Sequence, residues 1–272
     1  MRRKFNLLCA TVVVAVLLSA VSARAVEPLR IYAAGSLTDA FTEIAAAFPV
    51  PPGSIAAPVF GPSGSLRQRI EKGEAADLLA SADMTQPRAL AKAQAGRFVA
   101  MFTRNRLCVL GRADLHLTPE SVLDRMLDPA VRVATSTPGA DPGGDYAWAV
   151  FARAEALHPG ARAILEAKAL KLVGGPDTKP LVPGRGQVEG VFLSHSADLM
   201  LGYCSSGEPV VKALPDLVNV RLPEALTVGP AYGLVVLSDH PLAARFALFV
   251  LSEQGQAILQ RHGFDPIGVA GP

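Results

Sequence analysis

Three turns in the sequence place glycines and other small residues just ahead of a helical pattern, and the first two of them also contain serines. They read "AAGSLTD" around Ser36, "FGPSGSLRQ" around Ser63 and "TPGADPGGDYAW" around Gly143. The start of a helix leaves backbone N–H groups without partners and carries the positive end of the helix dipole. If the three helix starts converge, they would bind an anion without any Lys or Arg.

Each turn alone also fits ordinary helix capping. Ser36 followed by Asp39 forms a capping box, which stabilises a helix by about 1 kcal/mol. The segment around Gly143 equally fits a simple loop. The anion-binding hypothesis therefore requires elements that bring the turns together.

The first 25 residues have the pattern of a secretory signal peptide. A basic start at residues 2–4 precedes an apolar run at 7–18, and small residues lead up to an expected cleavage after Ala25. The apolar run is too short to span a membrane comfortably. A retained membrane anchor is the alternative, and we expect an exported, periplasmic protein.

The charge balance excludes a general attraction for anions. The chain carries 26 Lys and Arg and 24 Asp and Glu; residues 1–25 hold four of the basic residues and none of the acids, which leaves 22 against 24 after cleavage. No basic tract or aromatic–basic pattern indicates nucleic-acid binding. Any anion site must therefore be built locally.

Two of the three cysteines, Cys108 and Cys204, lie beyond the leader. In an exported protein they could form one disulfide, or both could remain as buried strand residues. Their spacing fits neither a zinc site nor a redox pair.

Strand-like and helical patterns alternate along the rest of the chain. Strands are expected at 29–35, 55–61, 76–81, 106–111, 132–137, 170–175, 199–205 and 231–237. Helices are expected at 36–48, 65–73, 85–96, 146–157, 188–195 and, as one long amphipathic helix, 241–263. This order predicts mostly parallel sheets covered by helices, in two lobes. A ligand would lie in the cleft, near helix starts at the carboxyl ends of strands.

The first two turns resemble those of the periplasmic molybdate-binding proteins, the substrate-binding components of molybdate ABC importers. "AAGSLTDAF" is similar to the family's opening AAxSLTxA, and "FGPSGSLRQRIEKGEAADLLASADM" to its second block. The similarity runs from about Leu29 to Phe264. It implies a type II periplasmic binding protein: two α/β lobes, each a mostly parallel sheet flanked by helices, joined by a two-strand hinge.

With this organisation, lobe 1 would span 26–106 plus 233–272 and lobe 2 would span 107–232. The resemblance also implies ligand-binding residues at matching positions. Ser36 and Ser63 match the ligand-contacting serines of the two blocks. Gly143 stands in place of a family alanine whose backbone N–H contacts the ligand.

Two further ligand positions follow from the resemblance. Val188 matches a valine whose backbone N–H contacts the ligand, with Gln187 as a competing choice, and Tyr203 matches a tyrosine whose hydroxyl donates. The sequence departs from the family after this tyrosine, where "CSS" lacks the usual Asp, and again at "GPAYGL", where the family often has Tyr-Pro. Tyr203 and Val188 also fit purely packed positions.

The implied residue types suit molybdate or tungstate. Both are tetrahedral dianions without a proton to donate, so a selective site should contain hydroxyl and N–H donors. An acid in the lining would repel them, whereas a phosphate site can use an acid to accept a proton. The implied set contains no acid and requires no cofactor, which favours a fully ionised oxyanion.

Other functions fit less well. A hydrolase is not expected, because no G-x-S-x-G elbow is present and the five histidines form no spaced pair. A binding protein for sulfate, another oxyanion or a small organic anion is the main alternative, since Tyr146, Trp148 and Tyr232 could line its cleft. A sensor of the same fold is a third possibility. We expect a monomer whose partner is a membrane permease.

Overall fold

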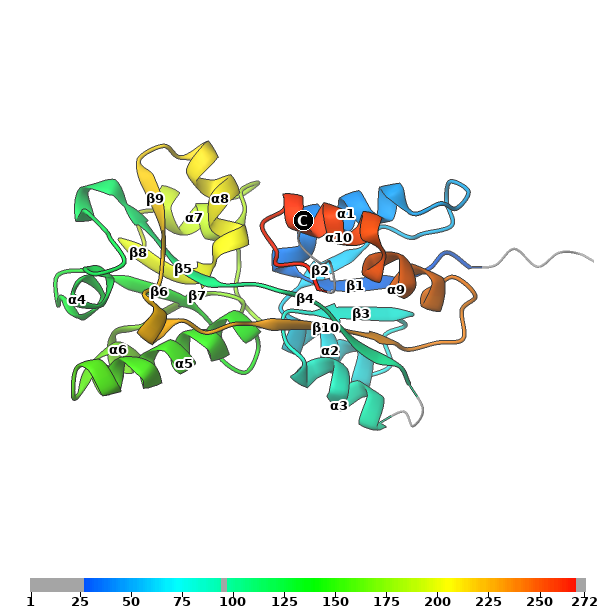
Figure 1. The fold of residues 1–272 in the computed structure, drawn as a ribbon, viewed down its shortest axis with the longest axis horizontal. Coiled ribbons are helices and arrows are strands. Elements are labelled where there is room, and N and C mark those ends of the chain that lie inside the picture. The colour runs from blue at the N-terminus through cyan, green and yellow to red at the C-terminus, as the bar shows by residue number, and fades with distance from the viewer. Residues whose placement is uncertain (1–26, 94–96, 268–272) are drawn as a thin grey trace, which may run out of the picture.

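The computed structural model describes residues 27–93 and 97–267, so the expected signal peptide lies outside the described part. Within these ranges the chain folds into two lobes side by side, each a sheet flanked by helices (Figure 1). The predicted two-lobed α/β architecture is confirmed. Among the described residues, no helix has the length and apolar character that a membrane span needs.

Lobe 1 is built on a five-stranded sheet in the order β2-β1-β3-β10-β4. Its strands are β1 (Ile31–Ala34), β2 (Val59–Gly61), β3 (Leu78–Ser81), β4 (Val99–Arg104) and β10 (Ala231–Val236). Its helical segments are η1 (Gly35–Leu37), α1 (Thr38–Ala47), α2 (Ser63–Glu71), α3 (Thr85–Ala93), α9 (Ala243–Leu251) and α10 (Glu253–Arg261).

Alternating side chains of this sheet build two apolar layers. Leu78 points into the main core with Phe41 of α1 and Phe246 of α9, whereas the next residue, Leu79, joins Leu66 of α2 on the other face. Helices therefore cover both faces, which fixes the directions in which η1 and α2 leave the sheet.

Lobe 2 has a second five-stranded sheet in the order β7-β6-β8-β5-β9. Its strands are β5 (Leu107–Arg112), β6 (Val133–Ser136), β7 (Leu170–Val173), β8 (Leu199–Tyr203) and β9 (Leu217–Arg221). Its helical segments are η2 (Ala113–Leu115), α4 (Val122–Leu127), α5 (Pro142–Leu157), α6 (Ala161–Lys168), α7 (Gln187–Leu193), α8 (Cys204–Ala213) and η3 (Glu224–Leu226). Helix α5 packs on one face of the sheet, and α7 and α8 pack on the other.

Two details differ from the expectations. Each sheet is mixed, with two parallel and two antiparallel pairings, because β10 runs against β3 and β4 in lobe 1, and β5 runs against β8 and β9 in lobe 2. The single helix expected over 241–263 is two helices, α9 and α10. Ser252 between them has an extended backbone, and its hydroxyl accepts the N–H of Gly255, so it caps α10.

The chain crosses between the lobes twice, through residues 105–106 and 227–230. The crossings run side by side, since the N–H of Asn105 donates to the carbonyl of Pro230 at 2.9 Å (Figure 1). The buried Asn105 amide also donates to the hydroxyls of Ser205 in lobe 2 (2.7 Å) and Tyr232 in lobe 1 (3.2 Å). This side chain therefore ties both lobes to the crossing.

Cys108 and Cys204 form a disulfide, with their Cα atoms 4.8 Å apart. The sequence left this pairing open. The bond joins β5 to the first residue of α8, beside the crossing, and so fixes where the serines after Cys204 lie.

Candidate functional site

A cavity of about 660 Å³ lies where the two lobes meet. Ser36, Gly143, Val188 and Tyr203 line it, as does the alternative residue Gln187. These positions come from separate parts of the sequence, and the fold brings them to one place. Ser63 is not in the lining formed by the described residues.

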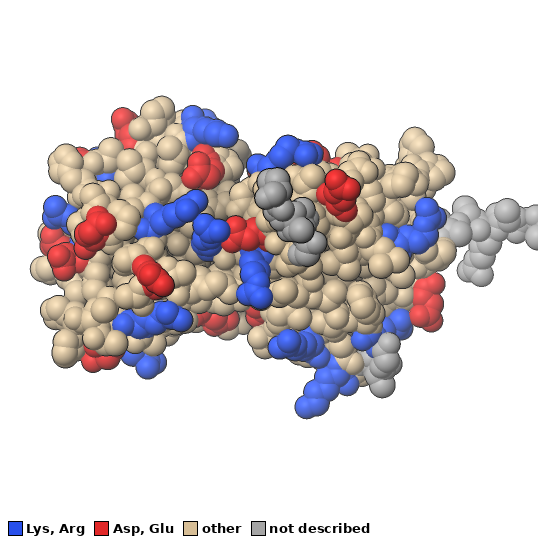
Figure 2. Space-filling view, in the orientation of Figure 1, with Lys and Arg blue, Asp and Glu red and all other residues tan. Residues whose placement is uncertain are grey.

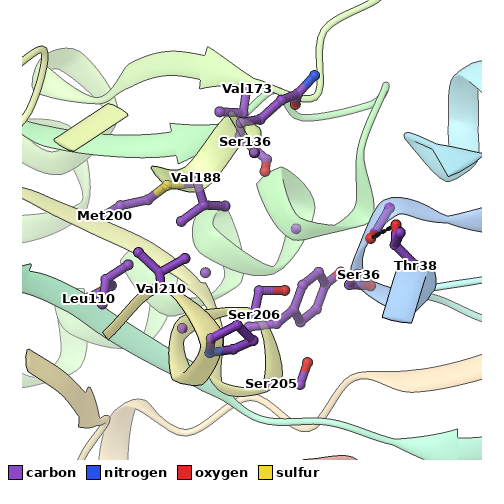
Figure 3. Close-up of a pocket in the computed structure, with 18 of the residues that line it drawn as sticks. Ser36, Thr38, Leu110, Ser136, Val173, Val188, Met200, Ser205, Ser206 and Val210 are labelled. Carbon is purple, nitrogen blue, oxygen red and sulfur yellow. Dashed lines mark hydrogen bonds between the residues drawn. The ribbon is translucent and has the colours of Figure 1, made fainter. Parts of the chain in front are cut away.

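Ser36 lies in the turn η1 of lobe 1, where Figure 3 shows it beside Thr38. Its hydroxyl oxygen is 2.9 Å from that of Tyr232. The Tyr232 hydroxyl also accepts from the Asn105 amide, so its own hydrogen can donate to Ser36. Burial raises the pKa of Tyr232, which keeps this hydrogen in place. In that arrangement the hydrogen of Ser36 is left to donate into the cavity.

Ser205 reaches the cavity from lobe 2 in the same way. Its hydroxyl accepts from the Asn105 amide, which leaves its hydrogen for the cavity, and Ser206 lines the cavity beside it. The "CSS" segment, first noted for the Asp that it lacks, therefore adds two hydroxyls to the lining. The sequence signal was present, because these serines directly follow Tyr203.

Tyr203 ends β8 and is only 9% exposed. Its hydroxyl is buried and has no hydrogen-bond partner among the described residues. Its ring lies 5.6 Å from the ring of Tyr232 and 6.4 Å from that of Tyr146, and burial raises its pKa. A buried hydroxyl without a partner costs about 1–3 kcal/mol, which a hydrogen-bond acceptor on a ligand would recover.

The backbone N–H of Gly143 is already engaged. It donates to the Asp141 carboxylate at 3.0 Å, because Asp141 caps α5. Asp141 also lines the cavity, as do Asp39 and Glu189. The expectation of an acid-free lining is corrected: the cap residue two positions before Gly143 brings a carboxyl to the site.

The Asp141 carboxyl lies among other acids. Burial, the largest cause, and the charges of Asp145 and Asp83 raise its pKa to about 6. Its hydrogen bond with Gly143 opposes this rise. The group therefore changes charge between mildly acidic and neutral pH, and its negative charge would repel an inorganic dianion bound beside it.

The turn around Ser63 has a different role in this structure. Ser63 is fully buried, and its hydroxyl accepts the N–H of Ala82 at 3.1 Å. The next residue, Gly64, donates its N–H to the carbonyl of Ala140 in lobe 2 at 3.0 Å. The start of α2 thus binds the opposite lobe, while Gly61 and Pro62 before it contribute to the lining.

The beginning of α7 forms another part of the wall. The Val188 side chain packs against the apolar cluster of lobe 2, and the Gln187 side chain accepts the N–H of Gly174 at 3.3 Å. Figure 3 shows Val188 near Met200, on the side of the cavity away from Ser36. Leu110, Met200 and Val210 add apolar side chains to this side of the cavity, next to the polar Gln187 and Asn219.

The distribution of charged and potential metal-binding side chains in the described residues indicates neither a nucleic-acid-binding surface nor a metal site. Figure 2 shows Lys and Arg interspersed with Asp and Glu over the visible face, without an extended basic stripe. Within 27–93 and 97–267, no group of three or more His, Cys, Asp or Glu side chains could hold a metal ion.

The fold is shared with solved proteins of low sequence identity. The sulfate-binding protein SubI from Mycobacterium tuberculosis is 18% identical, with a TM-score of 0.69 over 89% of this chain and 87% of that one. The periplasmic molybdate-binding protein of Azotobacter vinelandii is 18% identical, with a TM-score of 0.66 over 90% and 100%. PEB3 with bound L-phospholactate, known from Campylobacter jejuni, is 16% identical, with a TM-score of 0.65 over 87% and 99%.

Sequence comparison identifies the family. The chain is 35% identical over 240 residues to the uncharacterized protein PM1146 of Pasteurella multocida, which covers 88% of this chain and 98% of that protein. Residues 29–265 match the model of a family described as bacterial extracellular solute-binding protein. With two lobes around a lined cavity and this match over most of its length, the chain belongs to the bacterial extracellular solute-binding proteins.

Proposed function

We propose that this protein captures an oxyanion between its lobes, with molybdate and tungstate as the first candidates, and delivers it to the membrane permease of an ABC importer. The observation that carries the proposal is Tyr203, which lines the cavity and whose buried hydroxyl has no hydrogen-bond partner among the described residues. Ser36 from lobe 1 and Ser205 from lobe 2 add donors to the same space. The Azotobacter neighbour is a molybdate-binding protein, which supports the choice of first candidates.

The two-lobed arrangement gives capture a physical basis. A ligand that accepts hydrogen bonds from Ser36 and from Tyr203 contacts both lobes at once, so it favours the closed form over the open one. The permease would then recognise the closed form. In this proposal the mature protein acts in the periplasm as a monomer.

Asp141 favours a second candidate, an oxyanion that retains a proton. Its carboxylate can accept that proton, whereas it repels a fully ionised dianion. Hydrogen phosphate and small organic anions with a phosphate or phosphonate head have this property. The neighbours with bound L-phospholactate and with a sulfate-binding name show that the fold serves several anions.

Catalysis is not favoured by the lining. No histidine is among the lining residues in the described part of the chain. The Ser205 hydroxyl accepts a hydrogen bond from the Asn105 amide, which cannot act as the general base that a serine nucleophile needs. The family is one of solute-binding proteins.

Calorimetric titration of the mature protein with molybdate, tungstate, sulfate and phosphate tests the proposal. Tight molybdate binding that excess sulfate does not displace supports the first candidate. Binding of phosphate in preference to molybdate supports the second candidate. The absence of both heat and thermal shift with every anion, including small organic ones, would reject oxyanion capture.

A further inference from the structure

The cavity has two chemically different ends. The polar end, where hydroxyls gather, is lined by Ser36, Thr38, Ser136 and Tyr203. The other end, which we call the apolar annex, is lined by Leu110, Val188, Met200 and Val210. Figure 3 shows Leu110, Met200 and Val210 grouped on the lobe 2 side, away from Ser36 and Thr38.

The floor of the annex is one face of the lobe 2 sheet. Across β5 and β8, Cys108 lies opposite Gly202 and Leu110 opposite Met200, so these four residues face the same side. All four line the cavity. A Cβ atom placed on Gly202 would meet no heavy atom of the described residues within 4 Å, so the space above this glycine is open.

The roof of the annex is helical. Val188 at the start of α7 and Val210 of α8 stand over the floor, and both also pack against the apolar cluster of lobe 2. The disulfide to Cys204 fixes the start of α8, and the absent side chain at Gly202 leaves the space beneath it unfilled. The annex is thus an apolar extension of the same cavity that holds the hydroxyls.

A bare oxyanion would use only the polar end. Cavities of roughly 300–1,000 Å³ with an apolar wall and a few polar groups are typical of sites for small organic molecules, and this one measures about 660 Å³. An inorganic ion would leave the apolar wall of the cavity exposed to water. A hydrocarbon group on the ligand would cover this wall, and the removal of apolar surface from water would strengthen binding.

We infer that the site binds organic oxyanions, with the anionic head at Ser36 and Tyr203 and a short hydrocarbon group in the apolar annex, more tightly than an inorganic oxyanion with the same head. Short-chain alkyl phosphonates and phosphate monoesters represent this class. The inference rests on the proposed function, because it places the head in the proposed oxyanion site. Asp141 at the polar end suits such a head, since it can accept the proton that a phosphonate retains.

Titration of the mature protein with inorganic phosphate and with methyl-, ethyl-, propyl- and butylphosphonate at one pH tests the inference. Affinity should rise by up to about fourfold for each added methylene until the annex is full. Affinity that stays level or falls with chain length, while methylphosphonate or molybdate still binds, overturns the inference and leaves the proposed function standing. Failure of every anion to bind rejects both.

Two variants tie the effect to the annex. Gly202→Leu places a side chain in the open space, so the ratio of butylphosphonate to methylphosphonate affinity should fall from as much as about 60 to about 1. Val210→Ala enlarges the annex and should move the tightest binding to a longer chain. An unchanged chain-length profile in both variants, each shown to be folded by its melting curve, overturns the inference.

Gly229→Leu is the matched control. Gly229 is exposed in the second crossing, outside the cavity, and it also has open space around a built Cβ atom. The same substitution there should retain the full chain-length ratio. Loss of the ratio in this control as well would mean that the effect does not come from the annex.

Discussion

The two serine turns of lobe 1 look alike in sequence but have different surroundings in the structure. Each follows a parallel strand, β1 or β2, and each leads into a helical segment. Ser36 is partly exposed to the cavity, and its hydroxyl contacts Tyr232. Ser63 is fully buried, and its hydroxyl accepts the N–H of Ala82.

The neighbours of each turn account for the difference. Beside Ser36, a chain of hydroxyls and the Asn105 amide leaves a donor pointing at open space. Beside Ser63, the lobe 2 loop that contains Ala140 packs against the start of α2, and the carbonyl of Ala140 accepts the N–H of Gly64. A serine ahead of a helix therefore indicates that hydrogen-bond donors are present. The elements packed against the turn decide whether these donors bond to a ligand or to the protein itself.

The largest effect is expected from blocking the contact between the lobes at the second turn. A Cβ atom on Gly64 would lie 2.7 Å from the carbonyl oxygen of Gly139 and 2.8 Å from that of Ala140. Because backbone atoms cannot give way easily, Gly64→Val should hold the lobes apart and weaken ligand binding by more than about 100-fold. Calorimetry measures the affinity, and small-angle scattering with and without ligand measures closure.

Ser65→Ala is the control for this variant, since Ser65 is the next residue of α2 and lies outside the cavity lining. It should bind as the unaltered protein does. If Gly64→Val binds normally, the contact between Gly64 and Ala140 does not belong to the ligand-bound form.

Tyr203→Phe should weaken oxyanion binding by about 30-fold, because a hydrogen bond to a charged group contributes about 2 kcal/mol in a desolvated site. Removal of a buried hydroxyl that has no partner in the described protein should leave the melting temperature level or raise it. Tyr32→Phe serves as the control, since the Tyr32 hydroxyl donates to Glu74 at 2.5 Å, away from the cavity. Equal affinity losses in both variants would remove Tyr203 from the site.

Alanine at the two serines tests the difference between the turns directly. Ser36→Ala should reduce affinity by about tenfold. Because Ser36 lines the cavity, a water molecule can replace its oxygen as the acceptor for Tyr232, so stability should change less than in Ser63→Ala. Ser63→Ala leaves the buried N–H of Ala82 without an acceptor, so it should lower the free energy of unfolding by about 1–3 kcal/mol and change affinity little. Denaturant unfolding and calorimetry on both variants give the two quantities, and the reverse pattern would exchange the roles of the turns.

Much of the fold could be predicted from the sequence, because buried strands form short continuous apolar runs and helices repeat apolar residues at helical spacing. The strands at residues 31–34 and 78–81 lie inside the predicted segments, and each is continuously buried. The helix α8 was not predicted, because "CSSGEPVVKA" contains Pro209 and directly follows a strand without a loop. The break at Ser252 was missed since the apolar spacing continues across it, and only its cap reveals the end of α9.

Less of the site could be predicted from the sequence, because protein groups compete with a ligand for the same hydrogen-bond donors. Ser36 and Tyr203 were named from the sequence and lie on the same cavity. The sequence could not show that Asp141 takes the N–H of Gly143, since an Asp ahead of Pro142 fits a loop as well as a cap. Nor does any local pattern encode the contact between Gly64 and Ala140, which exists only when the lobes meet.

The smallest expected effect concerns the charge of Asp141. The carboxyl has a pKa of about 6, so it is mostly neutral at pH 5 and ionised at pH 7.5. An ionised carboxylate repels a dianion, so the affinity for molybdate should fall about three- to tenfold over this range. In Asp141→Asn the side-chain oxygen can still cap Gly143, and the affinity should change little with pH. Titrations at both pH values compare the two proteins, and a steeper pH dependence in the variant would exclude repulsion by Asp141.

Unfolding of the ligand-free protein checks the same group independently. Because the folded-state pKa of Asp141 lies above its unfolded value of 3.8, the folded state binds more protons between these values. Its contribution to stability is therefore present below about pH 4 and is lost as the pH rises through about 6. Glu74, whose pKa is lowered to about 2 first by Arg69, acts in the opposite direction, so only the difference between the two proteins isolates Asp141. The free energy of unfolding of Asp141→Asn, relative to that of the unaltered protein, should rise with pH up to about pH 6 and then level off. A difference that is the same at every pH in this range would mean that Asp141 titrates normally and that its charge at the cavity wall is constant.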